Sequence, residues 1–256
     1  MTTLELMSSR PARANVEVLV LAAARIDGAP SLLTDGIITE DLDVGALATA
    51  LSAVGFTGEL DEVARVPSGA LGPGMTADCV LVVGTGTDPG PGDATALGAT
   101  RAGSLKRAAG CAARTLSGSG SAAFLLPADR PDDLVAVAEG ALVGAYAWSG
   151  RVPSPKAPLG RVVVATALAD SAEASAAEAR AIALAEATAL ARDLVNEPPN
   201  RLTPQTFTQR ARAVADDAGL DIEILDEALL REQGFGGIVG VGQGSVHPPF
   251  LVRVSW

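Results

Sequence analysis

The sequence predicts an α/β fold in which a mostly parallel or mixed sheet is covered by helices. Apolar runs of strand length alternate along the chain with longer segments whose apolar residues recur at helical spacing. The apolar runs are continuous rather than alternating, so helices should cover both faces of the sheet. Strands are expected at residues 16–22, 77–83, 121–126 and 161–165.

Helices are expected between these strands at residues 41–54, 94–116 and 131–148. The first has apolar side chains at helical spacing, including Leu47 and Leu51, and ends before Gly55. Pro131 opens the third, and Asp132 and Asp133 follow in the first turn, where the helix dipole favours anions. These elements define a first domain at residues 14–166, preceded by a flexible N-terminus at 1–13.

A long Ala-rich helix is expected at residues 171–195, within a linker that spans 167–200. It must end near Asn196, because Pro198 and Pro199 remove two backbone donors and disfavour helical geometry before them. One apolar stripe runs along it at helical spacing. The stripe consists of Ala183, Leu184, Ala187, Leu190, Ala191, Leu194 and Val195.

A second domain is expected to begin in residues 201–256. Thr203 is suited to cap a helix that starts at Pro204 and stops at Gly219. A strand at 221–225, a short helix capped by Asp226, a glycine-rich segment and a strand at 250–256 follow. This piece is too small to build a stable core by itself. We therefore expect a truncated domain whose last strand is exposed or poorly packed.

Composition limits the function. The 256 residues carry a net charge of −11, which disfavours nucleic acid as a partner, because phosphate binding needs clustered Lys and Arg. No apolar run approaches the roughly 20 residues that span a bilayer. The N-terminus lacks a signal-peptide pattern, so a cytoplasmic location is the default expectation. Cys79 and Cys111 show no metal spacing and are expected to be buried thiols.

Two glycine-rich segments are candidate phosphate sites. Gly84 and Gly86 follow a predicted strand, but the third glycine of the dinucleotide fingerprint is missing. The run at 234–245 lacks the lysine of a phosphate-binding loop, and a strand rather than a helix is expected after it. Tight turns or close backbone contacts are the preferred interpretation of the run at 234–245, and phosphate binding at Gly84 and Gly86 is not favoured.

The candidate catalytic residues also have simpler explanations. His247 is the only histidine and is expected in a loop, so neither a histidine-based zinc site nor a Ser-His-Asp triad is predicted. The acidic pairs Asp132 with Asp133 and Asp216 with Asp217 are interpreted as solvated helix faces. From the residues alone, no catalytic, metal or cofactor-binding position is assigned.

Two motifs resemble the leucyl aminopeptidase (cytosol aminopeptidase) family. Residues 191–204 (ARDLVNEPPNRLTP) are similar to the family's hinge segment. Residues 234–245 (GFGGIVGVGQGS), together with PPFL at 248–251, are similar to the opening of its catalytic domain. Residues 14–166 resemble its macrodomain-like N-terminal domain more loosely, through the alternation of strands and helices.

The resemblance implies a hexameric enzyme that removes N-terminal amino acids from peptides. In the family, two divalent metal ions, Mn or Zn, bind the amino terminus and activate a water. Their ligands come from a Lys-and-Asp motif and an Asn-Thr-Asp-Ala-Glu-Gly-Arg motif, and neither occurs in this chain. The chain itself is therefore expected to be inactive and to bind no metal. The alternative is a macrodomain-like binding or oligomer-assembly module without hydrolytic activity.

Overall fold

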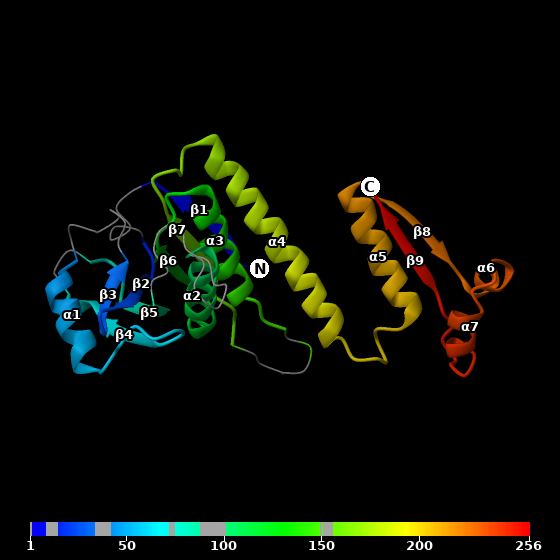
Figure 1. The fold of residues 1–256 in the computed structure, drawn as a ribbon, viewed down its shortest axis with the longest axis horizontal. Helices are drawn as coiled ribbons and strands as arrows, with labels where there is room; N and C mark the ends of the chain where they lie inside the picture. Colours follow the sequence, from blue (N-terminus) through cyan, green and yellow to red (C-terminus); the bar gives the residue numbers. More distant parts are fainter. Residues whose placement is uncertain are drawn as a thin grey trace. The chain divides into compact units, whose positions relative to one another are not determined.

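A computed structural model describes residues 2–8, 15–33, 42–71, 75–87, 101–148, 150 and 156–256. The chain divides into two compact units, Met1–Leu190 and Ala191–Trp256 (Figure 1). The division falls inside one long helix. The predicted domain boundaries at 14–166, 167–200 and 201–256 stay predictions.

The first unit contains a mixed sheet, as predicted. Its strands follow the order β1-β7-β6-β2-β5-β4, with β3 paired to β2. Strands β1, β7, β6, β2 and β5 run parallel to one another, while β3 is antiparallel to β2 and β4 is antiparallel to β5. The bounds are β1 Thr3–Met7, β2 Val18–Ile26, β3 Ala29–Leu33, β4 Val63–Pro67, β5 Cys79–Thr87, β6 Ser121–Leu125 and β7 Arg161–Ala165.

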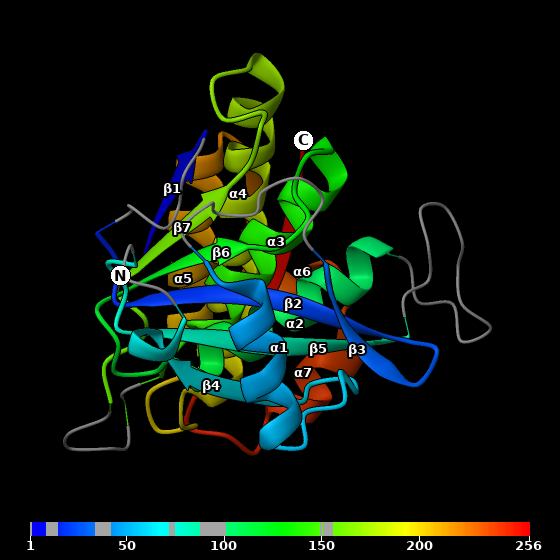
Figure 2. The same cartoon turned by 90° about the vertical axis from the view of Figure 1, so that its left-hand side faces the viewer.

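Helices bury both faces of this sheet (Figure 2). On one face, α1 (Val44–Ala53) inserts Leu47 and Leu51 into a cluster with one set of strand side chains. On the other face, α2 (Arg101–Thr115), α3 (Pro131–Gly144) and the first half of α4 (Ala172–Asn196) pack against the opposite set. Consecutive residues of β2 and β5 are buried for this reason, which confirms the interpretation of their continuous apolar runs.

The second unit contains the end of α4 and a small α/β arrangement. Helices α5 (Pro204–Ala218), α6 (Glu227–Glu232) and α7 (Gly236–Gly242) accompany an antiparallel pair of strands, β8 (Asp221–Leu225) and β9 (Leu251–Ser255). Helix α5 has the predicted ends: Thr203 caps it, Pro204 opens it, and Gly219 closes it with φ of 67°.

The second unit has a much smaller core than the first. Its buried cluster consists of Leu225, Leu230 and Val239. Strand β9 is at most half-buried along its length, and Trp256 is fully exposed. The expectation of an exposed last strand is therefore confirmed within the described residues.

Several local predictions were wrong. Residues Thr3–Met7 are not loose but form β1, which pairs with β7. Strands β3 and β4 were not foreseen. On α4, the buried residues are Ala174, Ala177, Ala181 and Ala185, while Leu184 and Val195 of the predicted stripe are exposed. The first three of these small side chains pack into the core of the first unit, so the buried face of α4 is marked by alanine rather than by the larger apolar residues of the predicted stripe. Residues 94–100 of the helix predicted at 94–116 lie outside the described part.

Helices α2 and α3 approach closely because Gly140 has no side chain. A Cβ atom on Gly140 would lie 2.2 Å from the backbone oxygen of Lys106 on α2. Ion pairs lie along this contact: Arg101 Nε is 3.2 Å from Asp133 Oδ2, and Lys106 Nζ is 2.6 Å from Glu139 Oε1. Asp133 is only 3% exposed, so its predicted place on a solvated face is wrong. Its charge is compensated by Arg101 rather than by water alone.

The loop at residues 57–62 covers the end of β5. Arg107 on α2 donates from Nε and Nη2 to both carboxylate oxygens of Asp61, at 2.6 to 3.0 Å. Asp61 adopts a left-handed backbone with φ of 63°, which is uncommon for a residue with a side chain. The hydrogen bond and charge of Arg107 lower the pKa of Asp61, with burial opposing. This pair fixes the loop to α2.

A second carboxylate closes the same loop from within. Glu62 Oε2 accepts from Thr57 N, Thr57 Oγ1 and Glu59 N at 2.8 to 3.1 Å. Burial alone would raise the pKa of Glu62, but these hydrogen bonds lower it. The loop is thus held at two points.

We predict that Gly140→Ala destabilises the first unit by about 2 kcal/mol or more, because a methyl group must displace a helix backbone. Chemical denaturation followed by circular dichroism measures the change. The matched control is Gly240→Ala on α7, where nothing lies within 4 Å of the added Cβ. A Gly140 variant as stable as the parent would contradict the close contact.

We also predict a pH-dependent effect of Asp61→Asn, a change that retains tolerance for the left-handed backbone. Because the folded pKa of Asp61 is lowered, its contribution to stability is present above its unfolded pKa of about 3.9 and is lost as pH falls through the folded pKa. The side chain is 37% exposed, so solvent screening limits the effect to about 0.5–1 kcal/mol at pH 7.

Urea denaturation of the two proteins between pH 7 and pH 3 measures this difference. The free energies of unfolding should converge toward the acid end of the range. A constant difference across the range would show that the Arg107 pair does not stabilise the loop through charge.

Candidate functional site

The space beside Gly84 and Gly86 is filled by protein. Both glycines lie inside β5, and a Cβ on Gly84 would lie 1.9 Å from the carbonyl oxygen of Glu59. Leu60 contacts the position of a Cβ on Gly86 at 3.4 Å. The glycines therefore admit the 57–62 loop, which leaves no cradle for a phosphate at this point.

The second glycine-rich segment folds differently from the prediction. Residues Gly236–Gly242 form helix α7, whereas a non-helical segment was expected. Gly234 alone of the glycines in this run has a left-handed backbone, with φ of 79°, and it ends the α6 region. A Cβ on Gly242 would meet the ring of Pro249 at 2.7 Å. Packing against Pro249 explains the glycine at position 242, and residues 234–245 do not form a phosphate-binding loop.

The candidate catalytic side chains are not brought together. His247 is exposed, and its backbone N–H donates to Ser245 Oγ at 3.0 Å. Asp216 and Asp217 are exposed near the end of α5, as predicted. Within the described ranges, no group of three or more His, Cys, Asp or Glu is placed to hold a metal ion.

The two thiols lie in settings that do not favour a nucleophile. Cys79 is buried and accepts a hydrogen bond from Arg65 Nε at 3.1 Å. Cys111 is partly buried rather than fully buried as predicted, and burial raises the pKa of its thiol. A raised pKa keeps the thiol protonated and unreactive near neutral pH.

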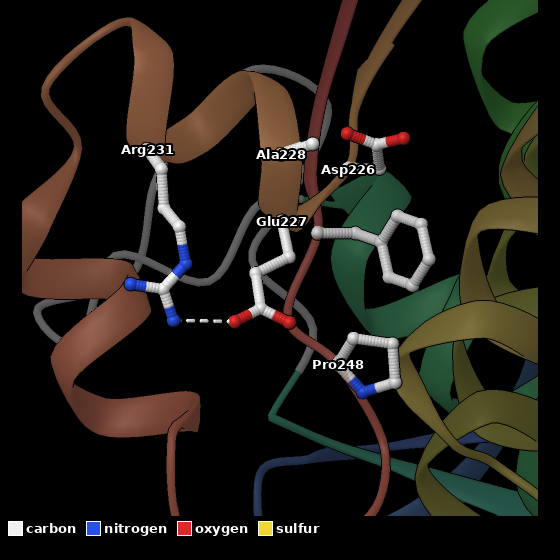
Figure 3. Close-up of a pocket in the computed structure, with 6 residues that line it drawn as sticks. Asp226, Glu227, Ala228, Arg231 and Pro248 are labelled. Atoms are coloured by element: carbon white, nitrogen blue, oxygen red, sulfur yellow. Dashed lines mark hydrogen bonds and ion pairs between the residues drawn. The ribbon is translucent and has the colours of Figure 1, made fainter.

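A hollow of about 550 Å³ lies beside α6 in the second unit (Figure 3). Its charged groups already have partners. Arg231 Nη2 lies 2.6 Å from Glu227 Oε1, and Asp226 Oδ1 accepts from Leu229 N at 3.0 Å as the cap of α6. The lining residues are Asp226, Glu227, Ala228, Arg231, Pro248 and Phe250. This arrangement can contact another chain or a ligand, but it presents no unpaired acid or base for catalysis.

A second hollow of about 410 Å³ lies between α5 and the start of β9. Phe250 lines both hollows. The lining residues are Gln205, Thr208, Gln209, Arg212, Ala213, Asp216, Ile224 and Phe250. Sequence reasoning assigned Phe250 to a strand and missed these hollows, because they depend on how α5 and α6 pack around it.

No helix in the described part of the chain is long and apolar enough to cross a membrane.

Two domain models of one protein family match successive parts of this chain. The model of the cytosol aminopeptidase family's N-terminal domain matches residues 29–149, and that of its catalytic domain matches residues 189–256. A probable cytosol aminopeptidase of Streptomyces griseus is 37% identical over 271 residues, covering 100% of this chain and 51% of the relative. One of Rhodococcus jostii is 40% identical over 248 residues, covering 94% and 46%.

Solved structures also superpose on most of this chain. The bottromycin maturation enzyme BotP in complex with Mn superposes with a TM-score of 0.67 and 27% identity, covering 93% of this chain and 45% of that one. A mutant of tomato leucine aminopeptidase superposes with a TM-score of 0.75, covering 99% and 50%; at 17% identity it shows the fold alone.

This chain spans about half the length of the curated relatives that it matches. The match to the catalytic-domain model includes the motifs at 191–204 and 234–245, and the match to the N-terminal domain model precedes it. The chain belongs to the leucyl aminopeptidase family, also called the cytosol aminopeptidase family.

Proposed function

We propose that this chain is the N-terminal portion of a metal-dependent aminopeptidase. In a protein of the relatives' full length, it would support the removal of N-terminal amino acids from peptides. The observation that carries the proposal is the presence of both family domains in one chain, with relatives named probable cytosol aminopeptidases aligned over nearly all of it.

The proposed enzyme uses two divalent metal ions, Mn or Zn, which would polarise the peptide carbonyl and supply a nucleophilic water. BotP, a structural relative, is described in complex with Mn. The described residues of this chain do not fit such a pair of ions, because they form no cluster of three or more metal-ligating side chains. We therefore assign no step of the reaction to residues of this chain and propose that the chain alone is inactive.

The proposed partners are peptides and further copies of the full-length enzyme, assembled as a hexamer in the cytoplasm. Nucleic acid is not proposed. The basic side chains Arg101, Lys106 and Arg107 on α2 are paired with Asp133, Glu139 and Asp61. The net charge of −11 also opposes phosphate binding. We propose no membrane partner.

We predict that the purified 256-residue chain does not hydrolyse leucine p-nitroanilide with added Mn²⁺ or Zn²⁺, because the ligands for a metal pair are missing from its described residues. Release of nitroaniline is followed by absorbance. The positive control is a full-length relative assayed under the same conditions. Metal-dependent turnover that copurifies with the chain would refute its inactivity.

The structure does not favour the alternative of a nucleotide-binding macrodomain-like module. Residues 58–60 occupy the space beside Gly84 and Gly86. Titration calorimetry with ADP-ribose should therefore give no binding heat at low micromolar protein. Saturable heat with a stoichiometry near one would revive the binding-module hypothesis.

A further inference from the structure

The turn between α4 and α5 contains a carboxylate that faces two arginines. Glu197, the first residue after α4, has a side chain that is only 13% exposed. Its Oε2 accepts from Nη2 of Arg210 on α5 at 3.4 Å. Its Oε1 lies 3.9 Å from Nη1 of Arg201, within the turn itself. Each carboxylate oxygen thus faces one guanidinium group.

The partner arginines come from two different segments. Arg201 lies in the turn, whereas Arg210 lies beyond the first turn of α5. A carboxylate paired with both arginines therefore connects the residue that follows α4 to the turn and to α5. Glu197 is mostly shielded from water, whereas the side chains of Arg201 and Arg210 are 65% and 41% exposed, so solvent screens the attraction in part.

Hydroxyl groups hold the other side of the same turn. Thr206 Oγ1 donates to the carbonyl oxygen of Arg201 at 2.8 Å and accepts from Thr203 N at 2.8 Å. The Thr203 hydroxyl in turn accepts from Thr206 N, which completes a capping box. The backbone N–H groups of Arg201 and Leu202 both donate to the carbonyl oxygen of Pro198 at 2.9 Å.

Prolines restrict the backbone of this segment further. Pro198 and Pro199 precede the turn, and Pro204 follows it as the first residue of α5. Each fixes its own φ angle and so lowers the conformational entropy of the unfolded segment. The turn therefore loses less entropy on ordering than an unrestricted loop of the same length.

We propose that residues 197–203 form a rigid elbow rather than a flexible hinge, and that Glu197 is the electrostatic clamp that keeps it closed. Glu197 is a positioning residue: it fixes the direction in which α5 leaves the end of α4. The family match runs through this segment, yet the inference rests on the contacts of the second unit and is independent of peptidase activity.

Trypsin cleavage after Arg201 tests the elbow, because the protease can bind this bond only when the turn opens locally. The Arg201 side chain is 65% exposed, so accessibility of the arginine itself does not prevent cleavage. Mass spectrometry of the 202–256 fragment gives the rate. We expect Glu197→Gln and Arg210→Met each to accelerate cleavage about 10-fold, the order expected from loss of one hydrogen bond to a charged group.

The double variant should be cleaved at about the rate of Glu197→Gln alone, since that substitution already removes the interaction with Arg210. The matched control is Glu227→Gln, which breaks the more exposed Glu227–Arg231 pair on α6 and should leave cleavage after Arg201 unchanged. Peptides covering 194–208 with Glu or Gln at position 197 correct for any direct effect on trypsin.

The response of the parent chain to high salt is a test that needs no variant, and the Glu197→Gln chain serves as its comparison. One molar NaCl should accelerate cleavage of the parent chain, relative to the peptide, and should leave the Glu197→Gln chain nearly unchanged. This arm applies even where a substitution prevents folding, which circular dichroism would reveal. A parent-like cleavage rate in folded Glu197→Gln, additive effects of the two substitutions, or no salt response in the parent would each overturn the clamp.

Discussion

The structure of the first unit depends on burying a largely parallel sheet on both of its faces. Strands β2 and β5 carry apolar side chains on both sides, so neither can be stable without helices above and below. Helix α1 covers one face, and α2, α3 and the first half of α4 cover the other. The close approach of α2 and α3 at Gly140 and the charge pairs along it follow from fitting the helices side by side on that face.

The second unit buries less apolar surface and depends more on local hydrogen bonds and ion pairs. Only Leu225, Leu230 and Val239 form its buried cluster, and β9 has little cover. Local interactions compensate in part: the capping box at Thr203, the prolines of the elbow and the Glu197 clamp order the start of α5 with little apolar burial.

The sequence predicted most of this where the signal was local. Thr203, Pro204 and Gly219 marked both ends of α5, and the continuous apolar runs identified β2, β5, β6 and β7. It failed where partners distant in sequence decide the structure. β1 is ordered by pairing with β7, more than 150 residues away, and Asp133 is buried by Arg101 from a neighbouring helix.

The candidate site shows the same division. Residue types and spacing predicted neither a triad nor a phosphate-binding loop, because those chemistries need fixed patterns. The role of Gly84 could not, since it depends on the 57–62 loop folding over β5. The glycine-rich run was expected to avoid helix on intrinsic preference, yet Val239 of α7 packs into the small core and offsets that preference.

Native-state hydrogen exchange, resolved by residue, tests the central claim that the chain joins one well-buried unit to one that is held mainly by local interactions. Amides of β2 and β5 should exchange only through global unfolding of the first unit. Amides of β8 and β9 should exchange at least about 100-fold faster, through a smaller opening. Equal protection of both sets, lost together at one denaturant concentration, would contradict the account.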